Sequence, residues 1–455
     1  MNLTRNRPTF MLPLLAAVLC LPRALAAQTA TDPLGSLVAA ALRDNLGIGA
    51  ERLAERRAAA EVRDARGLFL PSLALESRYS RLQGVPNLGD LLNPAYAALN
   101  QLTGTTRFPT DLDITLPPRH ESHVLLTQPV FNEGIRANYA AARARQDAQR
   151  MELAAAARQL AADVQVAYLQ YASGRRVVEI YEATLALVQE NERVAQRLLD
   201  AGRATPEAVY RARAERSAVE QQRAEAAERA VAAQRAFNRI LRRPLDSTVE
   251  TIPDSAFAIP LGISADSAVA HALASREELR QVGAAGRAAQ AARRAATAAF
   301  LPSVAVALDY GFQGPDVAFR GRDDYWVASL VVSWNLFNGG RDEARRAAAG
   351  YDVDRARLLQ QDLRDRIELE VRTVYEGARV AHDAIGTANA QLEAARRTFE
   401  LARRRYEEGV ASPIELVDAR TAYTSADLNR VITAYRYAIS RVELERSAAL
   451  RDIAF

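Results

Sequence analysis

Phe300-Leu301-Pro302-Ser303 repeats the earlier Phe69-Leu70-Pro71-Ser72, and this pair of motifs marks an internal duplication that decides the fold. At the same offset, Leu42 and Tyr79 align with Leu273 and Tyr310. Two further landmarks recur in the same order: Val130-Phe131-Asn132 as Leu336-Phe337-Asn338, and Gly202-Arg203-Ala204-Thr205-Pro206 as Gly409-Val410-Ala411-Ser412-Pro413. The 455-residue chain is therefore predicted to contain two copies of one unit. Two copies are too few for a solenoid, so closure must come from elsewhere.

A strand pattern follows each Pro-Ser pair. Apolar and small or polar residues alternate strictly over 303–312. A second segment continues the pattern and predicts a hairpin, with Trp326, Ala328, Leu330, Val332 and Trp334 opposite Tyr325, Ser329 and Ser333. In the first copy the strands are expected from Leu73 to Tyr79 and from about 120 to 131. Each strand has roughly the 9 to 11 residues that cross a bilayer at a tilt, although a soluble sandwich fits the alternation equally well. An aromatic girdle is predicted from Tyr79, Tyr310, Trp326 and Trp334.

The length of two predicted helices favours the membrane barrel over the soluble sandwich. No Pro interrupts residues 133–201 or 341–408, where Ala, Arg, Gln, Glu and Leu dominate. At 1.5 Å per residue each segment would be a rod of roughly 100 Å. Gly202 and Gly409 suit a left-handed helix end. Thr205-Pro206 and Ser412-Pro413 then suit the start of a returning helix. Both landmarks are therefore predicted to be the tips of helical hairpins.

The landmarks divide the chain into segments with distinct roles. In order these are a signal peptide at 1–26, helices at 27–67, a first β-hairpin at 68–131 with a long loop at 83–119, a first helical hairpin at 132–243 (tip 202–206), a linker at 244–266, helices at 267–299, a second β-hairpin at 300–337, and a second helical hairpin at 338–455 (tip 409–413).

The first 26 residues resemble a secretory signal, with Arg5 and Arg7, an apolar run, and Ala24-Leu25-Ala26 as the cleavage site. The apolar run of about a dozen residues is too short for the alternative, a membrane-anchoring helix of about 20 residues. Cys20 follows Leu19, where lipidation requires a small residue, so no lipid is predicted. All 59 basic residues are Arg, against 55 acidic ones. Without Arg5, Arg7 and Arg23 the mature chain is nearly neutral, which argues against a nucleic-acid partner.

Four strands per chain cannot close a membrane barrel, and open edges cannot face lipid. Two chains would supply eight strands, whose interior side chains fill, whereas three would supply twelve and leave a passage. We therefore expect a homotrimer.

The order of helix, strand pair and long helical hairpin, twice over, resembles the TolC-like outer membrane efflux channel family. Leu-Pro-Ser before the first strand, Gln128-Pro129-Val130-Phe131 before the long helix, and the Gly-x-x-Ser-Pro tip at 409–413 carry the resemblance, which covers essentially the whole mature chain. It implies a mainly α fold with a β membrane part, in which trimeric β-hairpins form a twelve-stranded barrel in outer-membrane lipid above a periplasmic helical tunnel.

The resemblance also implies a function and partners. The chain would be a passive exit duct of a tripartite efflux or type I secretion system. Its tips, at Gly202, Thr205, Pro206, Gly409, Ser412 and Pro413, would meet a periplasmic adaptor and, through it, an inner-membrane pump of the RND, MFS or ABC type. The pump would select the cargo, whether small molecules or polypeptides.

The family further implies a periplasmic gate. Aligning the tip Gly places its two acidic residues at Glu415 and Asp418, three apart on one helix face, and a helix-tying residue at Tyr406. The first copy departs from this pattern, because Ala208 matches Glu415 and Glu207 stands one residue earlier. The alternative is that Glu415 only caps a helix with Ser412 while Asp418 is solvated.

Two other functional classes fit the sequence less well. An enzyme is not predicted, since His120, His123, His271 and His382 form no metal pattern and Gly339-Gly340 lacks the rest of a nucleotide-binding motif. No catalytic residue, cofactor or metal is expected. A periplasmic coiled-coil adaptor is the alternative function, but an adaptor has one helical hairpin between split β domains, whereas this chain has two hairpins and paired amphipathic strands.

Overall fold

The computed structural model describes residues 34–453, except 82, 84–85, 115–118, 253–259, 315–316, 318, 322 and 409. The predicted leader with Cys20, and the tip residue Gly409, thus lie outside the described residues. The elements are α1 (Gly35–Asp44), α2 (Leu46–Gly67), β1 (Ser72–Tyr79), α3 (Leu88–Thr103), β2 (His120–Phe131), α4 (Glu133–Asp200), α5 (Pro206–Ile240), α6 (Ala265–Ser275), α7 (Glu277–Ala298), β3 (Ser303–Gly314), β4 (Asp324–Ser333), α8 (Arg341–Glu407) and α9 (Pro413–Ser447).

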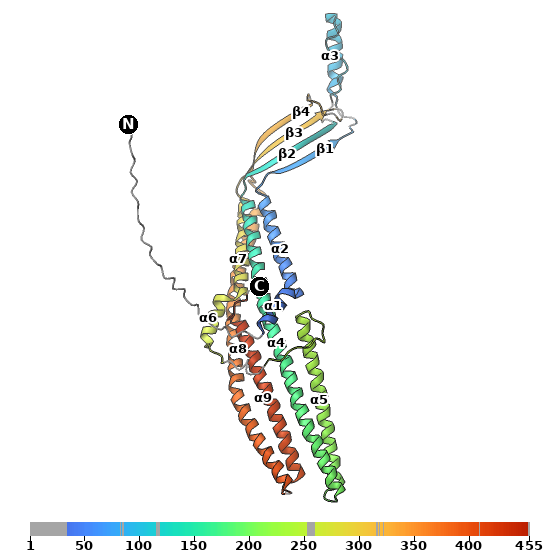
Figure 1. Cartoon of the computed structure of the whole chain (residues 1–455). Coiled ribbons are helices and arrows are strands. Elements are labelled where there is room, and N and C mark those ends of the chain that lie inside the picture. Colours follow the sequence, from blue (N-terminus) through green and yellow to red (C-terminus); the bar gives the residue numbers. More distant parts are fainter. Residues whose placement is uncertain are drawn as a thin grey trace, which may run out of the picture.

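The molecule is elongated, with the strands gathered near one end and the helical tips at the other (Figure 1). The strands form one antiparallel sheet in the order β1-β2-β3-β4. Of the segments described, β1 and β4 have a partner strand on one side only. The mainly α fold with a four-stranded β part is confirmed.

The register of the sheet separates an apolar face from a polar one. One row across the four strands joins Leu75, Val124, Tyr310 and Trp326, and the next joins Leu73, Leu126, Leu308 and Ala328. The alternate rows belong to the opposite face, and one of them joins Glu76 to His123, Gly311 and Tyr325. Leu75 is 75% exposed and Trp326 is 70% exposed, so the apolar face is uncovered in the single chain.

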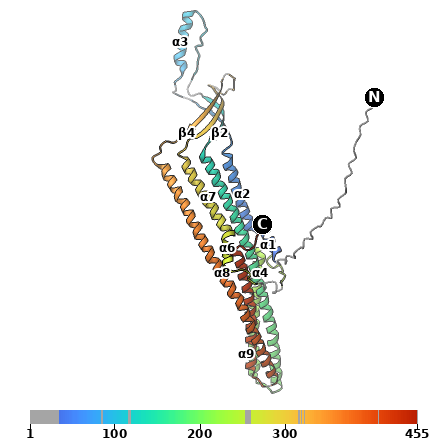
Figure 2. The same cartoon turned by 90° about the vertical axis from the view of Figure 1, so that its left-hand side faces the viewer.

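Between the sheet and the middle of the molecule, α2, α4, α7 and α8 lie side by side in one layer (Figure 2). Asn132 begins α4 because its side chain accepts a hydrogen bond from the Ile135 N–H at 3.2 Å. Gly340 begins α8 in the left-handed conformation, with φ of 80°. No helix in the described part of the chain combines the length and the apolar composition required to cross a bilayer.

Two apolar clusters hold the layer together at mid-length. In the first, α1 packs on α4 around Tyr168 and Phe237, both fully buried. In the second, α6 packs on α8 around Ile367 and Val371. Towards the tips, side chains at the helix contacts become small, and Gly174 lets α4 approach the backbone of Ala230 in α5. Long, closely spaced helices follow from this Ala-rich composition.

The predicted loop at 83–119 needs correction, because it contains the helix α3. Asn87 caps its start by accepting a hydrogen bond from the Gly89 N–H, and Gly104 ends it with φ of 60°. Pro94 lies within the helix. The Asn and Gly residues that suggested a loop include Asn87 and Gly104, which lie at the two ends of this helix. Figure 1 shows α3 projecting past the sheet, away from the tips.

Candidate functional site at the helical tips

The first tip turns on Gly202. Its φ of 68° is left-handed, and the Arg203 N–H donates to the Leu198 carbonyl oxygen at 2.7 Å, which closes the end of α4. Pro206 occupies the first turn of α5, as the sequence predicts. Thr205 stands at the N-cap position, but its side chain makes no capping hydrogen bond.

The second tip begins α9 with a side-chain cap. The Glu415 N–H donates to Ser412 Oγ at 3.3 Å, and Ser412 Oγ lies 3.4 Å from Glu415 Oε1. Pro413 follows in the first turn. The capping role that the sequence offered for Glu415 is therefore present, and its carboxylate also lies 3.9 Å from Arg405 Nη1.

The two tips face one another across a cavity of about 190 Å³. Four helices contribute to it, and among its lining residues are the predicted Thr205, Glu207, Tyr406, Ser412 and Pro413. Glu207 is held on its own helix by Arg211 at 3.2 Å. Thus five predicted residues from separate parts of the chain meet at one place.

Glu415 and Asp418 do not line this cavity. Both side chains are exposed in the single chain. Their spacing of three residues on α9 puts them on one flank of the helix, and this flank is free for contact with water or with another chain.

A buried ion pair beside the cavity escaped sequence reasoning. Arg420 of α9 pairs with Glu215 of α5, and their side chains are only 7% and 14% exposed. Burial lowers the pKa of Arg420 to about 10, so the guanidinium remains charged at neutral pH. Glu215 Oε2 is buried without a hydrogen-bond partner among the described residues. Each residue looks like any charge on an Arg- and Glu-rich helix, so the sequence carries no signal for the pair.

The predicted girdle residues lie at three levels along the strands of the sheet. Tyr310 and Trp326 are direct neighbours in the register, and Tyr79 pairs with His120 at the end of the strands farthest from the helical tips. Trp334 follows β4 at the opposite end, where its indole Nε1 donates to the Phe300 carbonyl oxygen at 3.2 Å. The apolar face between these levels is the part that a bilayer would contact.

Two His residues on β2 point to opposite faces. His120 bonds Ser122 Oγ at 2.8 Å on the apolar face, and His123 Nδ1 lies 2.8 Å from Asp309 on the polar face. Within the described ranges, no group of three or more His, Cys, Asp or Glu side chains is placed to hold a metal ion.

The chain is similar to outer membrane proteins both in sequence and in structure. The sequence model of the family described as "Outer membrane efflux protein" matches residues 268–449. The "Cation efflux system protein CusC" of Escherichia coli K12 is 25% identical over 317 residues, which cover 66% of this chain and 65% of the relative. The "Toluene efflux pump outer membrane protein TtgC" of Pseudomonas putida is 25% identical over 284 residues, covering 59% of this chain and 55% of TtgC. The matches thus span less than two thirds of these curated relatives.

Solved structures match over more of the length. A crystal structure of CusC superposes with a TM-score of 0.75 at 19% identity and covers 91% of both chains. The CmeC outer membrane channel of Campylobacter jejuni superposes with a TM-score of 0.75 at 18% identity, covering 91% of this chain and 85% of CmeC. The fold is therefore that of outer membrane channels.

Proposed function

We propose that this chain, which belongs to the TolC-like outer membrane efflux channel family, is the outer-membrane exit duct of a tripartite efflux or type I secretion system. One observation carries the proposal. A sheet with an exposed apolar face and two unpaired edges stands at one end of helices that the sequence makes roughly 100 Å long. Such edges cannot face lipid, so copies of the chain must close them.

Three copies suit the sheet best. Twelve strands leave an interior wide enough for a passage, whereas eight are filled by their own side chains. The face that would line the passage carries charged, small and polar residues such as Glu76, Ala307 and Ser329. It therefore suits water, while the opposite face suits lipid. The barrel would lie in the outer membrane and the helical tube would extend through the periplasm.

The tips supply the periplasmic end of the duct. The cavity lined by Thr205, Glu207, Tyr406, Ser412 and Pro413 opens between the two helical hairpins, and a helical hairpin of a periplasmic adaptor would dock over these tips. Through that adaptor the duct would receive cargo from an inner-membrane pump of the RND, MFS or ABC type. Threefold symmetry would turn Glu415 and Asp418 into two stacked rings of carboxylates, which narrow the entrance and favour cations.

The number of chains per particle, the ion conductance and the retention in the membrane together test the proposal. Light scattering in detergent should give three chains per particle, and planar bilayers should show stepwise, ATP-independent conductance. The protein should stay in the outer-membrane fraction after a urea wash, which removes a peripheral adaptor. A monomer without conductance, or release by urea, would contradict the proposal. We assign no catalytic step to the chain.

A further inference from the structure

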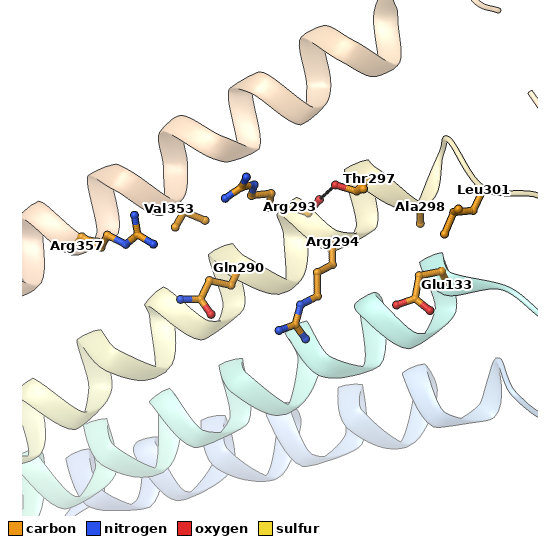
Figure 3. A pocket seen from close by; sticks show the side chains of 9 residues that line it. All are labelled: Glu133, Gln290, Arg293, Arg294, Thr297, Ala298, Leu301, Val353 and Arg357. Atoms are coloured by element: carbon orange, nitrogen blue, oxygen red, sulfur yellow. Dashed lines mark hydrogen bonds between the residues drawn. The ribbon is translucent and has the colours of Figure 1, made fainter. Parts of the chain in front are cut away.

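A basic cavity lies where the helix layer approaches the sheet. It encloses about 570 Å³ between the start of α4, the end of α7 and the membrane-proximal part of α8. Figure 3 shows Arg293, Arg294 and Thr297 of α7 opposite Arg357 of α8, with Glu133 of α4 below. Three guanidinium groups therefore line one opening, and Arg357 is paired with Asp354 of its own helix at 2.9 Å.

The α7 side of the cavity is positive because residues 279–308 contain no acidic residue. Among the described residues, neither Arg293 nor Arg294 has a carboxylate partner within 4.0 Å, while Glu133 pairs with Arg136 at 3.6 Å. Arg293 extends towards α8 and Arg294 towards α4 (Figure 3). Arg293 and Arg294 thus leave α7 on different sides of the same cavity, and each presents N–H donors of the kind that bind phosphate oxygens.

The cavity opens on the outer surface of the tube. Glu133, Asp147, Ala161 and Tyr168 are separated by multiples of seven residues, so they follow one flank of α4 in this left-handed type of packing. Asp147 pairs with Arg287 of α7 at 3.3 Å, on the same flank as the cavity. Ala161 and Tyr168 lie under α1 in the first apolar cluster. A passage through the tube must stay open, so α1 lies on the outer side of the helix layer. The cavity lies on the same flank of α4 and therefore also faces outwards.

The cavity also lies directly beside the proposed membrane boundary. Ala298 and Leu301 line its sheet-facing side, and β3 begins two residues later at Ser303. Next to it, the Arg346 guanidinium lies over the Phe300 ring at 5.1 Å, and Trp334 bonds the Phe300 carbonyl. Aromatic and basic residues at one level are typical of a membrane interface.

We propose that this cavity binds the phosphate group of a phospholipid from the periplasmic leaflet of the outer membrane. Arg293 and Arg294 donate to the phosphate group, Arg357 lies on the α8 side of the cavity, where it also pairs with Asp354, and the acyl chains lie along the apolar face of β3 and β4. The shared chemistry would also suit free phosphate, but only a lipid uses the adjoining apolar face. The inference rests on the proposed placement of the sheet in the membrane.

Phospholipid retention tests the inference. The full chain, first shown to resist a urea wash, is purified in detergent and incubated with mixed micelles containing phosphatidylglycerol and phosphatidylethanolamine, and bound lipid is counted by native mass spectrometry. About one phospholipid per chain should remain on the wild type at this site. The triple variant Arg293→Ala, Arg294→Ala, Arg357→Ala should retain at least fivefold less.

A matched control separates the site from overall charge. Arg203→Ala, Arg239→Ala and Arg364→Ala remove three exposed arginines far from the sheet and should leave retention unchanged. If the first triple variant does not assemble, Arg294→Gln alone should still reduce retention. Equal retention by all assembled variants would refute the site. Displacement of the lipid by millimolar inorganic phosphate would identify a soluble ligand and overturn the lipid assignment. Failure of the wild type to resist urea would instead contradict the proposed function.

Discussion

Arg420 and Glu215 form a buried ion pair that joins the two helical hairpins of one chain a few turns from their tips. The pair belongs to different copies of the duplicated unit, so it fixes the spacing between the copies. Charges removed from water are tolerated when paired, but either charge left alone is strongly unfavourable.

We therefore predict that Arg420→Ala destabilises the protein by about 3–5 kcal/mol, because it strands the Glu215 carboxylate. Thermal unfolding in detergent should show a clear fall in the midpoint. Arg396→Ala provides the control, since its partners Glu393 and Glu400 are exposed and such pairs contribute about 1 kcal/mol or less. If the melting midpoint of Arg420→Ala falls no further than that of the control, the buried pair stabilises the fold no more than an exposed ion pair does. Arg420→Met with Glu215→Met should recover most of the loss.

The turn at Gly202 depends on its left-handed backbone rather than on space. A Cβ there would meet no atom within 4 Å, but φ is 68°. Gly202→Val should therefore cost about 1–2 kcal/mol through backbone strain alone. Gly377→Ala in α8 is the matched control, with open space and an ordinary helical backbone, and should stabilise by about 0.4–1 kcal/mol. Opposite signs in the two melting shifts confirm the turn; equal shifts contradict it.

Gly311 allows β2 and β3 to lie closer together than a residue with a side chain would. A Cβ at this position would lie 2.6 Å from the His123 Cβ and 2.8 Å from the Ser122 carbonyl oxygen. Because backbone atoms cannot move aside easily, Gly311→Ala should force the strands apart and reduce the folded protein in urea-washed membranes several-fold. Gly321→Ala, in open space beyond the sheet, should accumulate normally. Normal folding of Gly311→Ala would mean that the register shifts to accept the methyl group.

The sequence predicts the long helices because their composition is uninterrupted, and it predicts the turns because Gly, Ser, Thr and Pro stand where helix ends require them. It fails at α3, where Asn87 and Gly104 resemble loop residues but serve as helix caps. It also cannot find Arg420 and Glu215, since their burial depends on how two distant helices pack. Helices and their turns can therefore be predicted largely from local sequence, whereas contacts between the two copies can be identified only in the folded structure.

A partly buried network around Arg276, at the junction of α6 and α7, should make stability decrease at acid pH. Arg276 donates to Glu278 Oε1 at 2.7 Å and to Glu370 Oε2 at 2.5 Å. Burial is the largest single influence on Glu278 and opposes its ionisation. The hydrogen bonds from Arg276 and from the backbone, together with the positive charges of Arg276 and Arg446, outweigh it, so the pKa of Glu278 lies below its usual 4.5. The unfolded chain then binds more protons at acid pH, and this stabilisation is present above about pH 4.5 and lost below it.

Glu278→Gln should thus lower the melting midpoint at pH 7 and make it fall less between pH 7 and pH 3.5. Glu228→Gln removes an exposed carboxylate of α5 that forms no ion pair within the described part of the chain, and should keep the wild-type pH dependence. Parallel pH curves for the wild type and Glu278→Gln would exclude this carboxylate as a source of the acid sensitivity.

The proposed gate at Glu415 and Asp418 makes the sharpest functional prediction. Both carboxylates are exposed on α9 just after the second tip, and in a trimer they would form two rings about one helical turn apart. Rings of carboxylates attract cations and bind multivalent ones at the entrance. Glu415→Ala with Asp418→Ala should therefore reduce cation preference and weaken block by divalent or trivalent cations added from the periplasmic side in planar bilayers.

Two controls separate gating from helix capping and from general charge. Ser412→Ala removes the side-chain cap of α9 but no charge, so it should lower stability by about 1 kcal/mol and leave ion selectivity unchanged. Glu407→Ala with Glu408→Ala removes two exposed carboxylates on the other side of the tip and should change selectivity less. Light scattering must show intact trimers for every variant. If the assembled double variant keeps wild-type selectivity and block, Glu415 acts as a helix cap and Asp418 as a solvated surface residue, because the charge that the gate requires would then be absent without consequence.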